Sequence, residues 1–183
     1  MRIPNSLSSF FVIIVAVAGA VQLSAADTNA PSLDPHLEPL RPLLEKTWRG
    51  AFKNSKPEKP VVDIMRWERA LNGRAVRVLH SINEGSYGGE IIFMWNQEKK
   101  VVAYQYFTTA GFITAGTMIF ENGKFITHEI VSGNAGVTEV KGTSELQADG
   151  SFVVKTEHLK DGKWEPGRET VYREDPTAKV VFR

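Results

Sequence analysis

The sequence predicts an all-β fold: a single antiparallel up-and-down meander closed into a barrel of about ten strands, preceded by a short helix. From residue 48 onward, runs rich in Val, Ile, Phe, Tyr and Thr alternate with compact turn signals, and no helical segment separates them. Closure removes the edge strands that so long a meander would otherwise expose. The turn signals are residue pairs that adopt tight reversals readily: Asn72-Gly73, Gly85-Ser86, Ala110-Gly111, Asn122-Gly123, Asp149-Gly150 and Asp161-Gly162.

The first 26 residues have the pattern of a secretory signal peptide. Arg2 gives a positive start, residues 10–20 are an apolar run, and Ser24-Ala25-Ala26 supplies the small-x-small pattern of a cleavage site. The run is short for a bilayer crossing, although an uncleaved membrane anchor is the alternative. We therefore expect an exported protein, periplasmic or secreted, cleaved at Ala26 or one residue earlier and without a stable membrane anchor afterwards.

Composition limits the classes of partner. Without residues 1–26, the chain carries 21 basic and 21 acidic side chains. Such a neutral, mixed surface gives no electrostatic reason to expect nucleic acid as a partner. Because the chain has no cysteine, a hydrophobic core and not a disulfide framework must hold the fold together. The length suits one domain.

The segment before the strands divides into two parts. Residues 27–36 are polar and read as a flexible lead-in, and residues 37–183 form the predicted barrel domain. Three prolines prevent a long regular helix at the start of that domain, so we expect one or two turns, best formed after Pro42. The apolar stripe of this helix consists of leucines at helical spacing: Leu37, Leu40, Leu43 and Leu44.

The turns also predict which side chains share a face, because a tight turn fixes the pairing of its strands. We apply this rule to five successive turns. The result makes Phe93, Tyr104, Thr117 and His128 successive cross-strand neighbours, with Val78 opposite Phe93. The predicted inward face carries Met65, Trp67, Val76, Val78, His80, Ile91, Phe93, Trp95, Val102, Tyr104, Tyr106, Ile113, Thr117, Ile119, Ile126, His128 and Ile130. The predicted outward face carries Arg66, Glu68, Arg77, Glu90, Asn96, Gln105 and Glu129.

The Ala110-Gly111 turn is the weakest link in this chain of pairings. If residues 109–112 form a bulged loop instead, a shift of one residue turns Thr117 and His128 outward. Four other side chains would then form the wall: Met118, Phe120, Phe125 and Thr127.

Beyond Ile130 the inward face depends on whether the next loop has an odd or an even number of residues. We favour the odd choice, which buries Val140, Leu146, Val153, Trp164, Thr170 and Tyr172 together with Lys155, Glu157 and Arg168. The even choice buries Phe152, Val154 and Val171 together with Glu145 and Glu169.

Three stretches resemble an uncharacterised family of exported bacterial lipocalin-like (calycin-type) proteins. Thr47-Trp48-Arg49-Gly50 is similar to the Gly-x-Trp motif through which lipocalins enter the barrel, with Lys46 in place of the first Gly. The other two stretches run from Trp67 to Arg74 and from Tyr106 to Thr117. The likeness covers most of residues 37–173. It implies an internal ligand cavity, brings no established activity, and places Trp48 as a plug at one barrel end. We expect this indole to stack under a guanidinium of the last strand, from Arg168 or Arg173.

No motif of a known catalytic class is present: the chain lacks Gly-x-Ser-x-Gly, His-Glu-x-x-His, a cysteine nucleophile and a phosphate-binding Gly-rich loop. We expect neither a cofactor nor a metal. His80 and His128 are the histidines on the predicted inward face. Each is a core histidine bonded to a neighbour, a ligand contact or, as a third alternative, a haem or metal ligand.

The leading hypothesis is an exported protein that binds a small apolar or amphipathic molecule inside the barrel. The predicted ligand-binding residues are Trp67, His80, Trp95, Tyr104, Tyr106, Thr117 and His128. One alternative is an enzyme that uses His128 as a general base in the same cavity. Another is a structural module with a filled barrel that forms a homodimer through outer-face residues: Ile92, Met94, Val101, Ala103 and Phe107.

Overall fold

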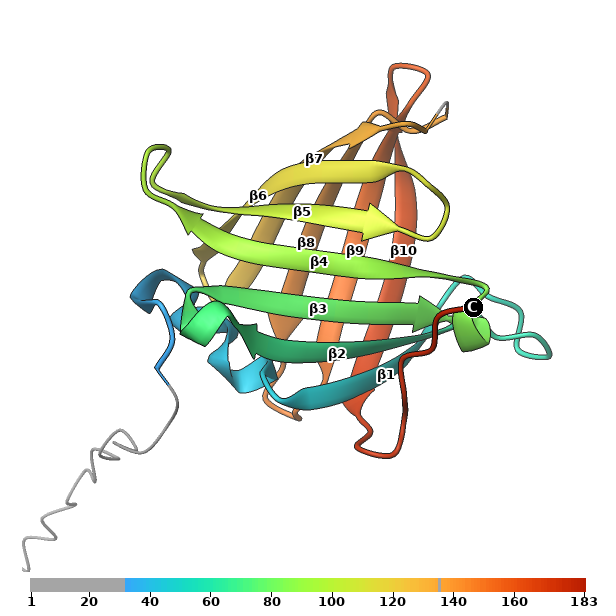
Figure 1. Cartoon of the computed structure of the whole chain (residues 1–183). Coiled ribbons are helices and arrows are strands. Elements are labelled where there is room, and N and C mark those ends of the chain that lie inside the picture. The colour runs from blue at the N-terminus through green and yellow to red at the C-terminus, as the bar shows by residue number, and fades with distance from the viewer. Residues whose placement is uncertain (1–31, 135) are drawn as a thin grey trace, which may run out of the picture. The chain divides into compact units, whose positions relative to one another are not determined.

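The computed structural model describes residues 32–134 and 136–183, so the predicted signal peptide lies outside the described residues. Ten antiparallel strands form a closed up-and-down barrel in which each strand pairs with its sequence neighbours and β1 pairs with β10 (Figure 1). This confirms the predicted fold class. No helix in the described part of the chain is long and apolar enough to span a membrane. The strands are β1 (Lys46–Phe52), β2 (Val62–Ala70), β3 (Ala75–Ile82), β4 (Tyr87–Asn96), β5 (Val101–Thr108), β6 (Ile113–Glu121), β7 (Lys124–Ser132), β8 (Glu139–Leu146), β9 (Phe152–Lys160) and β10 (Lys163–Glu174).

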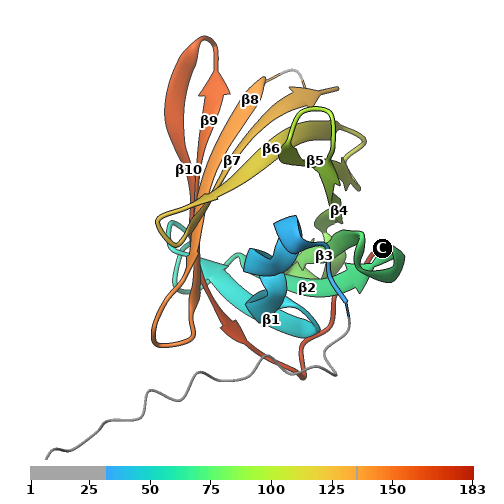
Figure 2. The same ribbon diagram turned by 90° about the vertical axis from the view of Figure 1, so that its left-hand side faces the viewer.

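A 3₁₀-helix, η1 (Pro35–Leu43), lies across one end of the barrel (Figure 2). Its three residues per turn place Leu37, Leu40 and Leu43 on one side, and all three are buried in the core. The prediction of a helix after Pro42 was therefore wrong, because the short helix accommodates its prolines and ends at Leu43. The carboxylate of Asp34 begins it by accepting the backbone N–H of His36 at 3.0 Å.

Part of the predicted lead-in belongs to the packed fold. Leu33 and Asp34 are buried, and the Asp34 N–H donates to the Gly73 carbonyl at 2.8 Å. Gly73 belongs to η2 (Leu71–Gly73), the turn between β2 and β3, and η3 (Asn83–Gly85) occupies the corresponding place between β3 and β4.

Trp48 plugs this end of the barrel, as predicted. It is 1% exposed, and its indole N–H donates to the Leu43 carbonyl at 3.2 Å. The predicted stacking under an arginine was wrong, because the cation near the ring is Lys46, 5.7 Å from the ring centroid. Trp48 pairs with Glu174, six residues along β10 from Arg168, and Arg173 bonds to Asp149.

The pairings of β2–β3, β4–β5 and β6–β7 agree with the prediction. Met65 lies opposite His80, Phe93 opposite Tyr104, and Thr117 opposite His128. Between β3 and β4, a four-residue connection replaces the predicted two-residue turn, so Val78 lies opposite Ile91 and not Phe93. Because the length of the connection differs from the prediction by two residues, the cross-strand partners change but the same side chains face inward.

The connection between β5 and β6 overturns the predicted faces of the next two strands. Phe107 pairs with Ile113, which leaves an odd number of residues between them, and Tyr104 lies opposite Gly116. The side chains of β6 and β7 are therefore reversed. Six residues that were predicted to face inward lie on the outer face instead: Ile113, Thr117, Ile119, Ile126, His128 and Ile130. The side chains that line the interior instead are Thr114, Met118, Phe125, Thr127 and Glu129.

The last three strands follow neither the odd nor the even choice throughout. Val140 and Leu146 face inward, as the odd choice predicts. After the β8–β9 connection, however, Phe152 and Val154 face inward, as the even choice predicts. A bulge between Pro166 and Glu169 reverses the alternation of β10 again, so that Arg168, Thr170 and Tyr172 point inward. The residues that the odd choice wrongly placed inside are Val153, Lys155, Glu157 and Trp164.

Candidate functional site

The barrel is not filled. It contains a partly open cavity of about 390 Å³ that is lined by side chains from all ten strands and from the β5–β6 and β7–β8 loops. Toward η1 the wall is apolar and includes Trp67, Phe93, Phe125 and Phe152, whose rings contact one another. Toward the opposite end the wall is polar and contains the groups described below.

Asp63 lies buried behind the polar wall, against two side chains that line the cavity, His80 and Arg168. Its side chain is fully buried, and its carboxylate accepts three hydrogen bonds: from His80 Nδ1 at 3.1 Å, Arg168 Nη1 at 3.2 Å and the Tyr172 hydroxyl at 2.8 Å. A buried carboxylate needs such compensation, because removal from water is otherwise strongly unfavourable. Asp63 therefore holds the guanidinium of Arg168 and the ring of His80 in place.

A chain of hydrogen bonds continues from His80 along the wall. His80 Nε2 lies 2.7 Å from the Tyr106 hydroxyl, which lies 2.6 Å from the Tyr87 hydroxyl. Because Asp63 accepts the proton on Nδ1, the Nε2 of a neutral ring accepts from Tyr106. Burial raises the pKa of both Tyr87 and Tyr106, so both remain neutral hydroxyls near pH 7.

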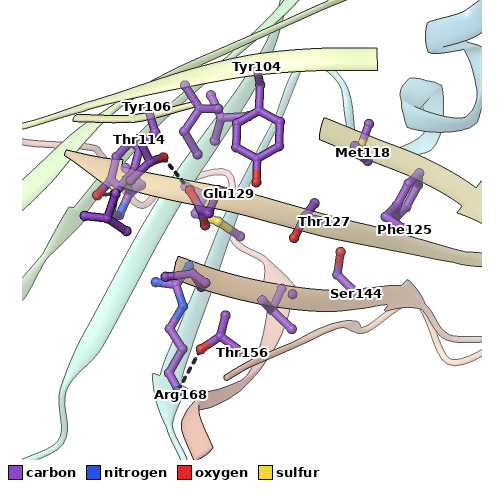
Figure 3. A pocket seen from close by; sticks show the side chains of 18 of the residues that line it. Tyr104, Tyr106, Thr114, Met118, Phe125, Thr127, Glu129, Ser144, Thr156 and Arg168 are labelled. Carbon is purple, nitrogen blue, oxygen red and sulfur yellow. Dashed lines mark hydrogen bonds between the residues drawn. The ribbon is translucent and has the colours of Figure 1, made fainter. Parts of the chain in front are cut away.

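Glu129 enters the cavity from β7. Its carboxylate accepts a hydrogen bond from the Thr114 hydroxyl on β6. Burial raises the pKa of Glu129, while the Thr114 hydrogen bond and the positive charge of Arg168 act in the opposite direction. Within the described residues, no Lys, Arg or His side chain forms an ion pair with Glu129. Figure 3 shows Tyr104, Glu129 and Arg168 extending from three different strands into the same space.

Two glycines make room for the tyrosines of this wall. A Cβ on Gly116 would lie 2.6 Å from Cζ of Tyr104, and a Cβ on Gly89 would lie 2.5 Å from Cε2 of Tyr106. Gly116 pairs with both Tyr104 and Glu129, so the Tyr104 ring lies over the backbone next to the carboxylate. The glycine on β6 thus sets the relative position of these two side chains.

The β10 bulge positions Arg168. Its backbone N–H donates to the Thr156 hydroxyl at 2.9 Å, which anchors the bulge to β9 (Figure 3). The guanidinium is partly exposed to the cavity, and Asp63 is its one hydrogen-bond partner among the side chains that the structure describes. His158 also lines the cavity, and burial together with the charge of Arg168 lowers the pKa of its ring.

Four of the seven predicted ligand-binding residues line the cavity: Trp67, His80, Tyr104 and Tyr106. Trp95 does not; it is half-buried near η1 and stacks on His36 with ring centroids 3.6 Å apart. Thr117 and His128 lie on the outer face because of the β5–β6 connection, and His128 bonds to Glu139 at 2.7 Å. With its side chain 48% exposed, His128 cannot serve as a general base inside the barrel, and that hypothesis was wrong.

The sequence reasoning missed Asp63, Tyr87 and Glu129. The first two could have been found by continuing the alternation of inward residues, because Asp63 precedes Met65 by two positions and Tyr87 lies at the start of β4 in phase with Phe93. Glu129 could be placed only by knowing the number of residues in the β5–β6 connection. No group of three His, Asp or Glu side chains suited to a metal ion occurs in the described ranges.

The fold and the cavity define a closed ten-strand barrel with a partly polar interior. The crystal structure of Rv2717c from M. tuberculosis has a similar fold, with a TM-score of 0.54 and 15% sequence identity, covering 79% of this chain and 99% of that one. At this identity the similarity concerns the fold alone. No family profile matches the chain, and no curated protein matches it either.

Proposed function

We propose that this protein binds a small amphipathic molecule inside the barrel. The observation that carries the proposal is the partly open barrel cavity of about 390 Å³ with an aromatic wall at one end and oriented polar groups at the other. Ligand cavities typically have this volume and this combination of apolar surface with a few fixed polar groups. The ligand's apolar body would lie against Trp67, Phe93 and Phe125, and its polar end would face Glu129 and Arg168.

A second observation supports an occupant. The indole N–H of Trp67 is buried without a hydrogen-bond acceptor among the described residues, and Trp67 lines the cavity. Buried donors are normally paired, with protein, water or ligand. A water molecule held in the cavity beside the apolar part of the ligand would satisfy this donor.

A matched pair of substitutions tests the proposal. Thr127 lines the cavity on β7, whereas Thr117 on β6 is exposed on the outer face. The neutral fluorophore N-phenyl-1-naphthylamine should bind the unmodified protein at one site. Thr127→Trp should weaken this binding at least tenfold because the indole occupies the cavity, while Thr117→Trp should leave it unchanged. Equal binding by both variants would place the fluorophore outside the barrel and contradict the proposal.

We also propose that the protein acts outside the cytoplasm, on the basis of the N-terminal pattern around Arg2 and Ala26. N-terminal sequencing of the protein from its source should find a chain that begins at Ala26 or Asp27. A chain that still begins at Met1 would contradict export by cleavage.

A further inference from the structure

We propose that the polar end of the ligand is a protonated amine, which pairs with Glu129 and lies against the ring of Tyr104. This inference rests on the proposed binding function and specifies its ligand class. It follows from the charges in the cavity, the position of Glu129 beside an aromatic ring, and the absence of any cation bound to Glu129 among the described residues.

The first step is the balance of charges. Asp63 and Arg168 are ion-paired at 3.2 Å, so their formal charges offset each other. Burial lowers the pKa of His158, which favours its neutral form. Glu129 is then the remaining formal charge: burial raises its pKa and the charge of Arg168 acts to lower it, but no cationic side chain of the described residues lies within ion-pair distance of it. Its carboxylate accepts a hydrogen bond from the neutral hydroxyl of Thr114. A cationic ligand would leave the cavity neutral, whereas a carboxylate ligand would add a second uncompensated negative charge.

The second step is the geometry around Glu129. Gly116 lies between Tyr104 and Glu129 in the strand pairing, and its lack of a side chain lets the phenol ring approach the carboxylate. On the other side, Thr114 pairs with Tyr106 and donates to Glu129. The carboxylate of Glu129 therefore lies beside the Tyr104 ring, and Tyr106 lines the same cavity on the neighbouring strand position. Ammonium groups bind favourably to such sites, because the carboxylate supplies charge and the rings supply cation–π attraction.

The third step concerns stability. Because burial raises the pKa of Glu129, the folded protein holds this proton more tightly than the unfolded chain does. The stabilisation that follows is complete below the unfolded pKa and is lost as the pH rises through the folded pKa. The ionised form of Glu129 is therefore less favourable in the folded protein than in the unfolded chain, and a bound cation would offset this cost.

The experiment compares three molecules that share a ten-carbon chain: decylamine, decanol and decanoate. Each is used below its solubility limit and, for decylamine and decanoate, below the micelle-forming concentration, near pH 7.5, to displace N-phenyl-1-naphthylamine from the unmodified protein. Decylamine should displace the fluorophore at a concentration at least tenfold lower than decanol, and decanoate should be the weakest of the three. Equal or stronger displacement by decanoate or decanol would overturn the amine assignment while leaving the binding function intact. Failure of the fluorophore itself to bind would overturn the proposed function instead.

Two variants identify the carboxylate. Glu129→Gln should remove the preference for decylamine over decanol, and its midpoint of thermal unfolding should equal or exceed that of the unmodified protein. Glu139→Gln, on the neighbouring strand and paired with the outward-facing His128, should keep the preference. If Glu129→Gln retains the tenfold preference, Glu129 is not the amine site. A markedly lower unfolding temperature for this variant would contradict the stability argument instead.

Discussion

Asp63→Asn is expected to destabilise the protein by about 3–5 kcal/mol, the usual effect of removing one partner of a buried ion pair. The amide keeps the size of the side chain but not its charge, so Arg168 would remain inside the barrel without a counterion. The amide would also serve His80 and Tyr172 less well, because half of its polar groups are donors. Urea unfolding at pH 7, with circular dichroism as the signal, measures the change.

Two further variants separate charge from general disruption. Asp149→Asn removes only an exposed ion pair with Arg173 and should leave the unfolding free energy nearly unchanged. The double variant Asp63→Asn with Arg168→Met removes both charges and should be clearly more stable than Asp63→Asn alone, because no buried charge is left unpaired. A double variant that loses the sum of both single effects would contradict the role assigned to this ion pair.

Trp48→Ala is expected to cost about 3–5 kcal/mol, because it removes a large ring from a fully buried position and leaves a void under η1. The matched control is Trp164→Ala. Trp164 is 37% exposed on the outer face of β10, where it contacts Lys141, so its loss should change stability far less. Equal losses for the two tryptophans in urea unfolding would contradict the assignment of Trp48 as the plug of the closed end.

The ten strands and their order could be predicted from the sequence, because each hairpin has a local signal in its turn residues. Which side chains face inward could be predicted only as far as the turn lengths were known. The predicted alternation of inward and outward side chains is correct from Met65 to Tyr106. The one wrong turn length in this stretch, at Asn83–Gly85, differs from the prediction by an even number of residues. The connection between Phe107 and Ile113 differs from the predicted length by one residue. This odd difference turns Glu129 into the barrel and His128 to the outside.

The polar wall of the cavity and the buried groups behind it could not be predicted as a unit, because they come from strands far apart in the sequence. Asp63 and Tyr172 lie 109 positions apart, and Arg168 reaches Asp63 only because a bulge turns it inward. Irregularities of this kind carry no strong sequence signal beyond the nearby Pro166 and Gly167. The apolar half was easier to foresee, since Trp67 and Phe93 follow from simple alternation.

The central claim is that a molecule binds inside the barrel, and native mass spectrometry with decylamine tests it most directly. The unmodified protein and Thr117→Trp should each carry one decylamine per folded chain, while Thr127→Trp, with its cavity filled, should carry none under the same conditions. Equal amounts of adduct on all three proteins would contradict a ligand site between Trp67 and Glu129, and no adduct on any of them would contradict an amine site there.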